Sequence, residues 1–136
     1  MNDKIELRKC IDVITAQLLP AAAVYKCKFE NNISTETYLL TDTEAFLFII
    51  NRLLKLMIQS SHDSRISISS VHDSDELTII IRDDNNDYRG FISGKMLKHQ
   101  PIIRKAGCCL RFEFSERKSI TVILRFFNQQ SSTPGS

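Results

Sequence analysis

The segment LTDTEAFLFIINRLLKLMIQSS, residues 40–61, decides the fold. Asp42 is a preferred helix N-cap, and Thr43 and Glu44 suit the first turn, where an acidic side chain faces the positive end of the helix dipole. The next residues cover a wide apolar face, which includes Phe46, Ile49, Ile50, Leu53, Leu54, Met57 and Ile58. Helices this apolar are buried, so residues 44–61 predict a central helix packed under a sheet.

Strand patterns lie on both sides of this helix. Each predicted strand is a short run of apolar or alternating residues bounded by polar turn residues. The predicted strands are 24–30 and 36–40 before the helix, then 65–71 paired with 76–83, and finally 109–116 paired with 119–127.

Two further helices complete the pattern. Leu7, Ile11, Ile14 and Leu18 have helical spacing after a short extended piece, and Pro20 is expected to end that helix. The segment 93–107, SGKMLKHQPIIRKAG, predicts a helix that is interrupted or restarted at Pro101 and capped by Gly107.

Hairpins interleaved with helices indicate an α+β fold. We expect a two-layer sandwich, in which one mixed, mostly antiparallel sheet carries about three helices on one face. No repeat or linker divides the chain, so residues 1–127 are expected to form one domain. The polar segment 128–136, NQQSSTPGS, is expected to be a disordered tail.

Composition narrows the function. A formal net charge of +2 argues against nucleic acid or an anionic membrane as a partner. No apolar run approaches the roughly 20 residues of a membrane span, and the charged N-terminus is no signal peptide, so a cytoplasmic location is expected. The four cysteines lack metal-ligand spacing, and no nucleophile motif is present, so neither a metal site nor catalytic residues are predicted.

Three segments resemble the ATP-binding catalytic domain of sensor histidine kinases, a Bergerat-type (GHKL) fold. Residues 40–61 resemble the turn and N-box helix of that family. RISISSVHDSDELTIIIRDD, residues 65–84, resembles the hairpin whose second strand ends in the G1-box aspartate. Residues 102–127 resemble the closing helix, turn and last hairpin. The three segments occur in the family's order, and the resemblance covers about residues 4–127.

The N-box positions depart from the family pattern. The resemblance implies two asparagines one helical turn apart, on one face, directed to Mg²⁺ and the phosphates. The aligned positions are Arg52 and Leu56. A leucine side chain cannot ligate Mg²⁺, which requires oxygen ligands.

The G1 box is altered as well. Asp83 stands where the family's aspartate accepts the adenine amino group, but the two glycines of Asp-x-Gly-x-Gly are replaced by Asn85 and Asp87. Asn85 is a tolerable replacement where a left-handed backbone is needed, whereas Asp87 adds negative charge near the phosphate position. Only YRGFISGKML, residues 88–97, stands in place of the long ATP lid, with Gly94 out of step with the G2 glycines.

Asp83 can also be interpreted as a purely structural turn residue at the end of a strand, and this interpretation is preferred to adenine contact. A cation site at Asp83, Asp84 and Asp87 is a weaker alternative because convergent oxygen ligands are not evident. The altered N-box and G1 positions indicate that the nucleotide site is vestigial. No cofactor is therefore expected, although weak ATP or ADP binding is possible.

These observations favour a non-catalytic, histidine kinase-like module of bacterial two-component signal transduction. It would dock a protein partner, either a response regulator, a phosphotransfer helical bundle or a kinase, and could form a homodimer. A groove between Arg52, Leu56 and Asp83 is the expected contact surface. The alternatives are a divergent catalytic domain with weak ATP binding and, ranked lower, an anti-sigma-like binder.

Overall fold

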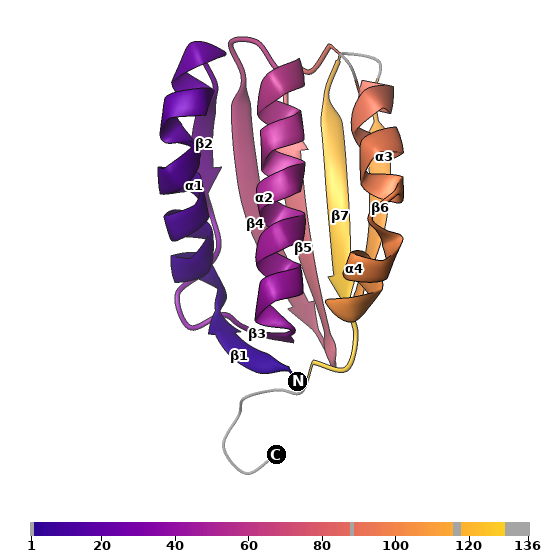
Figure 1. Cartoon of the computed structure of the whole chain (residues 1–136). Coiled ribbons are helices and arrows are strands. Elements are labelled where there is room, and N and C mark those ends of the chain that lie inside the picture. The colour runs from indigo at the N-terminus through magenta and orange to yellow at the C-terminus, as the bar shows by residue number, and fades with distance from the viewer. Residues whose placement is uncertain (1, 88, 116–117, 130–136) are drawn as a thin grey trace.

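A computed structural model of the 136-residue chain describes residues 2–87, 89–115 and 118–129. Figure 1 shows a sheet with a layer of helices in front of it. The described residues form helices α1 (Leu7–Val24), α2 (Thr43–Ser60), α3 (Arg89–Leu97) and α4 (Gln100–Lys105). The strands are β1 (Asp3–Glu6), β2 (Lys28–Asn31), β3 (Tyr38–Thr41), β4 (Arg65–Asp73), β5 (Glu76–Asp83), β6 (Cys108–Phe114) and β7 (Ile120–Phe126).

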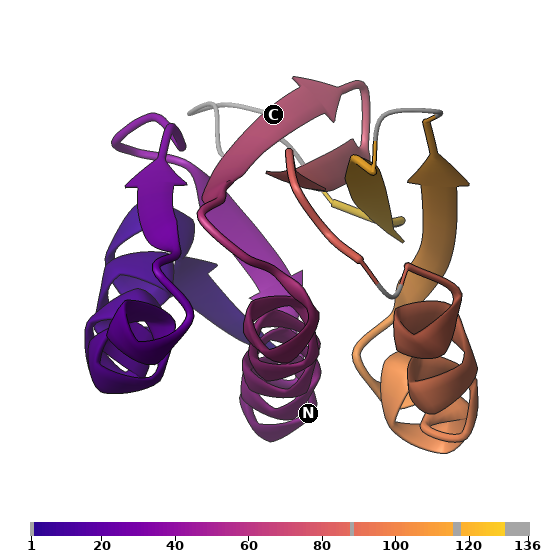
Figure 2. The same cartoon turned by 90° about the horizontal axis from the view of Figure 1, so that it is seen from above.

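The main sheet has five strands in the order β2-β4-β5-β7-β6. Only β2 and β4 are parallel; the other neighbouring pairs are antiparallel. All helices lie on one face of this sheet, α1 under one edge, α2 in the middle and α3 with α4 under the other edge (Figure 2). The predicted two-layer α+β sandwich is therefore confirmed.

Helix α2 is the centre of the core, as its sequence predicts. The side chain of Asp42 accepts a hydrogen bond from the Ala45 N–H (3.0 Å), which caps the first turn. The apolar side of α2 faces the inward side chains of β4, β5 and β7, and the Phe46 ring meets the Phe126 ring edge to face at 5.8 Å. Burial of this helix joins the two layers.

Two predictions about the first helix and the strand after it are wrong. Pro20 does not end α1, which continues to Val24. Pro20 is exposed and Ala22 is fully buried, so packing of the last turn offsets the hydrogen bond that proline cannot donate. The helix ends where Lys26 takes a left-handed conformation (φ 55°) and Cys27 N–H donates to Ala22 O. The strand predicted from residue 24 therefore starts at Lys28.

The predicted strands 24–30 and 36–40, for which no partner was predicted, belong to different sheets. Strand β2 joins the main sheet beside β4, whereas β3 pairs with β1 in a separate two-stranded sheet. The closing helix also begins earlier than predicted, at Arg89, and Gly107 (φ 72°) follows α4 as expected.

The side chain of Gln129 fastens the last described residues to β3. Its amide accepts a hydrogen bond from Leu40 N–H and donates one to Leu40 O, both at 2.8 Å. The folded part thus extends to Gln129, beyond the predicted boundary at 127. The rest of the predicted tail, 130–136, lies outside the described residues. Among the described helices, none combines the length and apolar character needed to cross a membrane.

Candidate functional site

The end of β5 places Asp83 beside the C-terminal end of α2. Asp83 is fully buried, on the side of the sheet that the helices cover. One carboxylate oxygen, Oδ1, accepts from the Asn85 N–H (3.1 Å). The other, Oδ2, accepts from the Ser61 hydroxyl and from the Asn86 side-chain amide, the latter at 3.0 Å. Both oxygens of the carboxylate are thus bound by the chain itself.

Burial and hydrogen bonding act on this carboxyl group in opposite directions. Removal from water disfavours the charged form and raises the pKa of Asp83, and this is the larger effect. The hydrogen bonds donated by Ser61, Asn86 and Asn85 stabilise the carboxylate and oppose the rise. The net pKa is higher than that of an exposed aspartate.

Asn86 holds this arrangement together and was not singled out from the sequence. It is fully buried; its side-chain amide also donates to the Ser60 hydroxyl (3.0 Å), and its N–H donates to Lys118 O (2.8 Å). Ser61 and Asn86 form an isolated antiparallel bridge. The only indication of this role in the sequence is that Asn86 follows Asn85 directly after the strand, and this pattern is equally typical of a polar turn.

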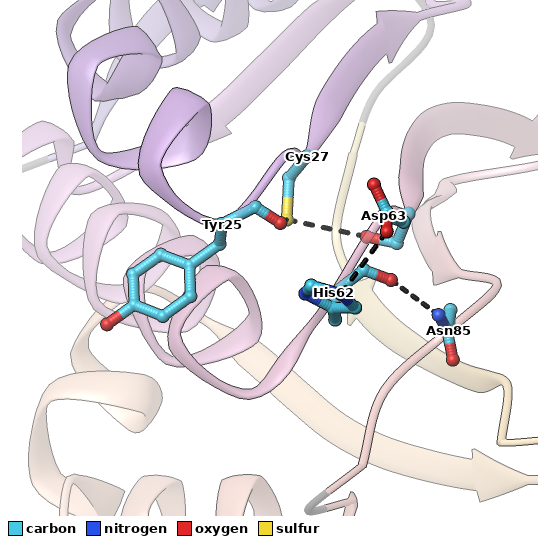
Figure 3. Close-up of polar contacts among 6 residues, drawn as sticks. Tyr25, Cys27, His62, Asp63 and Asn85 are labelled. Atoms are coloured by element: carbon cyan, nitrogen blue, oxygen red, sulfur yellow. Dashed lines mark hydrogen bonds and ion pairs between the residues drawn. The ribbon is translucent and has the colours of Figure 1, made fainter.

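Asn85 fastens the connection between α2 and β4 (Figure 3). Its side-chain amide donates a short hydrogen bond to His62 O, and the His62 N–H donates to Asn85 O (3.3 Å). The next residue, Asp63, reaches the end of α1, where its N–H donates to Tyr25 O (3.3 Å). Asn85 is not left-handed, since its φ is not positive. The expectation that it replaces a glycine conformation is therefore wrong.

Asp87 is exposed and its charge is paired. Its carboxylate lies 3.1 Å from the Lys118 ammonium, and its N–H donates to Ser60 O (2.9 Å). The backbone from Asn85 to Asp87 thus runs back along the end of α2 and donates its N–H groups to the chain. In this conformation, those groups do not point at a ligand.

The two N-box positions lie in different environments. Leu56 is buried in the core cluster, which also contains Ile92 and Met96 of α3, and α2 contacts α3. Arg52 is half-buried on the outer side of α2. It lines a hollow there with Leu47, Phe48, Asn51 and Lys55.

The structure therefore does not bring Arg52, Leu56 and Asp83 together as an open groove. Leu56 and Asp83 are both buried, so neither can form a contact surface. The expected contact surface is wrong at these two positions, because Leu56 lies in the core cluster and the carboxylate of Asp83 accepts hydrogen bonds from Ser61, Asn85 and Asn86. Among the described residues, no three His, Cys, Asp or Glu side chains gather as metal ligands do.

No protein-family model and no curated protein sequence matches the chain. Solved structures do match it. The histidine kinase AdeS of Acinetobacter baumannii has a TM-score of 0.79 at 12% identity, over 96% of this chain and 68% of that one. The chain has the fold of a histidine kinase catalytic domain.

Two further structures support this assignment. The catalytic domain of histidine kinase ThkA gives a TM-score of 0.77 at 12% identity, over 94% of this chain and 96% of that one. The mycobacterial sensor histidine kinase MprB gives 0.73 at 10% identity, over 96% and 100%. The resemblance drawn from the three sequence segments is thus confirmed for the fold. ThkA has also been solved in complex with a response regulator protein, TrrA (TM-score 0.71, 11% identity, over 93% of this chain and 42% of that one).

Proposed function

We propose that this histidine kinase-like chain is a non-catalytic module of bacterial two-component signal transduction that acts in the cytoplasm by docking a protein partner. The observation that carries the proposal is the state of Asp83. An adenine amino group needs access to a carboxylate oxygen, but Asp83 is fully buried and its carboxylate accepts hydrogen bonds from Ser61, Asn85 and Asn86. Displacing them would leave buried donors without partners, which costs free energy.

Leu56 supports the same conclusion. Its side chain is 2% exposed and belongs to the core cluster with Ile92 and Met96. A phosphate or Mg²⁺ at this position would need polar ligands and space, and the chain offers apolar packing. The loops that hold nucleotide in the family pattern are bound here to the rest of the domain.

The outer side of α2 is the surface we assign to the partner. Leu47 and Phe48 are 38% and 40% exposed there, beside Arg52 and the exposed Lys55. The Phe48 ring also meets the His99 ring edge to face at 5.0 Å. An apolar centre bordered by cations fits a partner with a small apolar contact and acidic residues around it. A response regulator, a phosphotransfer helical bundle or a kinase is the expected class of partner.

The alternative is a divergent catalytic domain with weak ATP binding. It is favoured by one observation, namely that Asp83 keeps its place at the end of β5 within an intact fold. Opening of the 85–87 segment would be required to free its carboxylate.

Nucleotide binding separates the two functions. Thermal melting is measured with Mg²⁺ and either ATP or ADP, alongside titration of a fluorescent ATP analogue. A ligand at 100 times its dissociation constant stabilises the folded state by about 2.7 kcal/mol. The proposal expects no shift at millimolar nucleotide. A shift that Asp83→Asn abolishes would establish the alternative.

The docking surface is tested with a matched pair of charge reversals. The chain is titrated with response regulators and helical phosphotransfer proteins from its own organism. Lys55→Glu is expected to weaken the affinity of the chain for the partner that binds it about tenfold or more, because it replaces a positive charge beside the apolar centre with a negative one. Lys28→Glu, the same change at an exposed position on β2, is the control. Equal effects of the two substitutions would exclude the outer side of α2 as the docking surface.

A further inference from the structure

The two edges of the main sheet are protected to different degrees. An edge strand presents unpaired backbone N–H and C=O groups, and proteins normally protect it with a short strand, a lysine, a proline or a bulge. At one edge, β2 has four residues and carries the exposed Lys28, and the Asn31 side chain donates to Arg8 O of α1 (3.1 Å). At the other edge, β6 has seven residues, contains no proline or lysine, and pairs with β7 without a bulge. The β6 edge lies above α3 and α4 (Figure 2).

The hydrogen-bond pattern shows which backbone groups β6 leaves free. In an antiparallel pair, residues alternate between those that bond to the partner strand and those whose N–H and C=O point away from it. Ser115 N–H donates to Ser119 O (3.1 Å), so in the same register Arg111 bonds to β7. The N–H and C=O groups of Leu110 and Phe112 therefore point to the free edge. No other part of the described chain gives these groups a backbone partner.

The side chains of β6 indicate what can pair with this edge. Leu110 and Phe112 are half-buried and pack against the core on the helix side of the sheet. Side chains of an added strand would alternate in the same way, so those opposite Leu110 and Phe112 would meet an apolar surface. On the other face, Arg111 and Glu113 lie 3.5 Å apart and balance each other's charge. The edge fits an extended backbone with an apolar residue at every second position.

The part of the chain around this edge is strongly basic. Residues 89–115, which include α3, α4 and β6, contain six Lys or Arg and one Glu, whereas the whole chain has a net charge of +2. The nearby carboxylates are paired, since Asp42 lies 3.9 Å from Lys105 and Asp87 3.1 Å from Lys118. These ion pairs leave a net positive charge beside the edge.

Arg104 places part of this charge at the start of β6. It is exposed, lines a hollow with Cys108 and Cys109, and has no ion-pair partner among the described residues. A strand that pairs with β6 would therefore end near an unpaired guanidinium, which favours acidic residues at the ends of that strand.

We propose that the β6 edge is a docking site for an extended acidic segment of a partner protein, which adds a sixth strand to the sheet. The free backbone groups bind the segment's backbone, and its alternate apolar side chains cover Leu110 and Phe112. A second copy of this chain fits poorly, because pairing two β6 edges would bring two basic regions together. A nucleic acid would match the charge but has no alternating row of N–H and C=O groups. This site is separate from the outer side of α2.

The probe is a synthetic peptide in which three valines alternate with two threonines, with two glutamates at each end. Its binding to the full chain is measured by calorimetry, and amide hydrogen exchange by NMR locates the site. Exchange of the Leu110 and Phe112 N–H groups is expected to slow when the peptide binds, because both gain hydrogen bonds. Absence of binding at millimolar peptide would overturn the proposal, as would protection confined to other strands.

Two N-methylated peptides form a matched pair. In the proposed pairing the N–H of the central valine points to β6, whereas the N–H groups of the threonines point away. Methylating the valine nitrogen is expected to weaken binding about tenfold or more, and methylating one threonine nitrogen is expected to have a smaller effect. Equal affinities of the two peptides would overturn strand addition.

The contribution of charge is tested by two substitutions in the chain. Arg104→Glu is expected to weaken binding of the glutamate peptide severalfold, and Lys28→Glu, at the other edge of the sheet, is expected to leave it unchanged. Equal effects would overturn the choice of an acidic segment. Protection of Leu110 and Phe112 that rises with chain concentration in the absence of peptide would assign the edge to a second copy instead. Displacement of the peptide by oligothymidylate would assign the basic region to nucleic acid. None of these readouts depends on nucleotide binding or on docking at α2.

Discussion

Replacing Leu56 with asparagine restores the amide that the histidine kinase resemblance implies at this position, and it is expected to damage the fold without creating a site. Leu56 is 2% exposed in the centre of the core. Truncating a buried leucine costs about 2–5 kcal/mol, and a buried amide without partners costs a further 1–3 kcal/mol or so. Asparagine fills much of the volume of the leucine side chain, so the expected loss lies toward the low end of this sum, at about 4 kcal/mol.

That loss is a large part of the stability of a domain this size, typically about 5–15 kcal/mol. In urea, with a slope of about 2 kcal/mol per molar, the unfolding midpoint should fall by about 2 M. Gln59→Asn is the control, since Gln59 is exposed on the same helix and its substitution should change stability by less than about 0.5 kcal/mol.

The urea curves are measured with and without Mg²⁺ and ATP. The reasoning expects both Leu56→Asn curves to coincide. A stability loss below about 1 kcal/mol would mean that Leu56 is not packed as described. Stabilisation of Leu56→Asn by Mg²⁺ and ATP would show that a usable phosphate site remains beside α2.

Three other outcomes are expected. Because the pKa of Asp83 is raised on folding, the folded state binds more protons than the unfolded state. The stability of the wild type should therefore fall relative to that of Asp83→Asn as the pH rises from about 4 through the folded pKa. Urea midpoints measured across this pH range check the prediction, and a difference that does not change with pH would contradict it. Gln129→Ala removes both hydrogen bonds to Leu40 and should cost about 2 kcal/mol in thermal or urea unfolding; an unchanged midpoint would mean that the contact does not stabilise the fold. Burial raises the pKa of Cys108 to about 12, so iodoacetamide at pH 8 should label exposed Cys109 and spare Cys108 until the chain is unfolded, as read by mass spectrometry; equal labelling of the two thiols in the folded protein would refute the burial of Cys108.

The sequence was most informative where one local pattern decides the structure. The apolar face of 44–61 and the N-cap Asp42 predicted α2, and the turn HDSD predicted the β4–β5 hairpin. It failed where pairing depends on distant residues. Nothing in 24–30 or 36–40 says that these strands join different sheets, because those partners, β4 and β1, lie elsewhere in the chain.

The candidate site was located from the sequence, but its interior was not. The altered motif placed Asp83 at the end of a strand, where the structure has it. Which donors meet a buried carboxylate depends on how the loops fold back, and Ser61 and Asn86 are separated by the whole β4–β5 hairpin. Leu56 was recognised as unable to bind Mg²⁺, but its burial depends on tertiary packing that no local pattern shows.

The fastening of Gln129 to β3 has a topological consequence. Asn2 and Gln129 line the same hollow, and the Gln129 N–H donates to Asp75 O, in the turn just before β5. Both ends of the described chain therefore lie at one pole of the domain (Figure 1). Asp83 lies at the other end of β5. A short linker from Gln129 to Asn2 would close the backbone into a ring, and a circular permutant opened at a surface turn should keep the same layers. A domain joined to either end would likewise be attached at the pole away from Asp83.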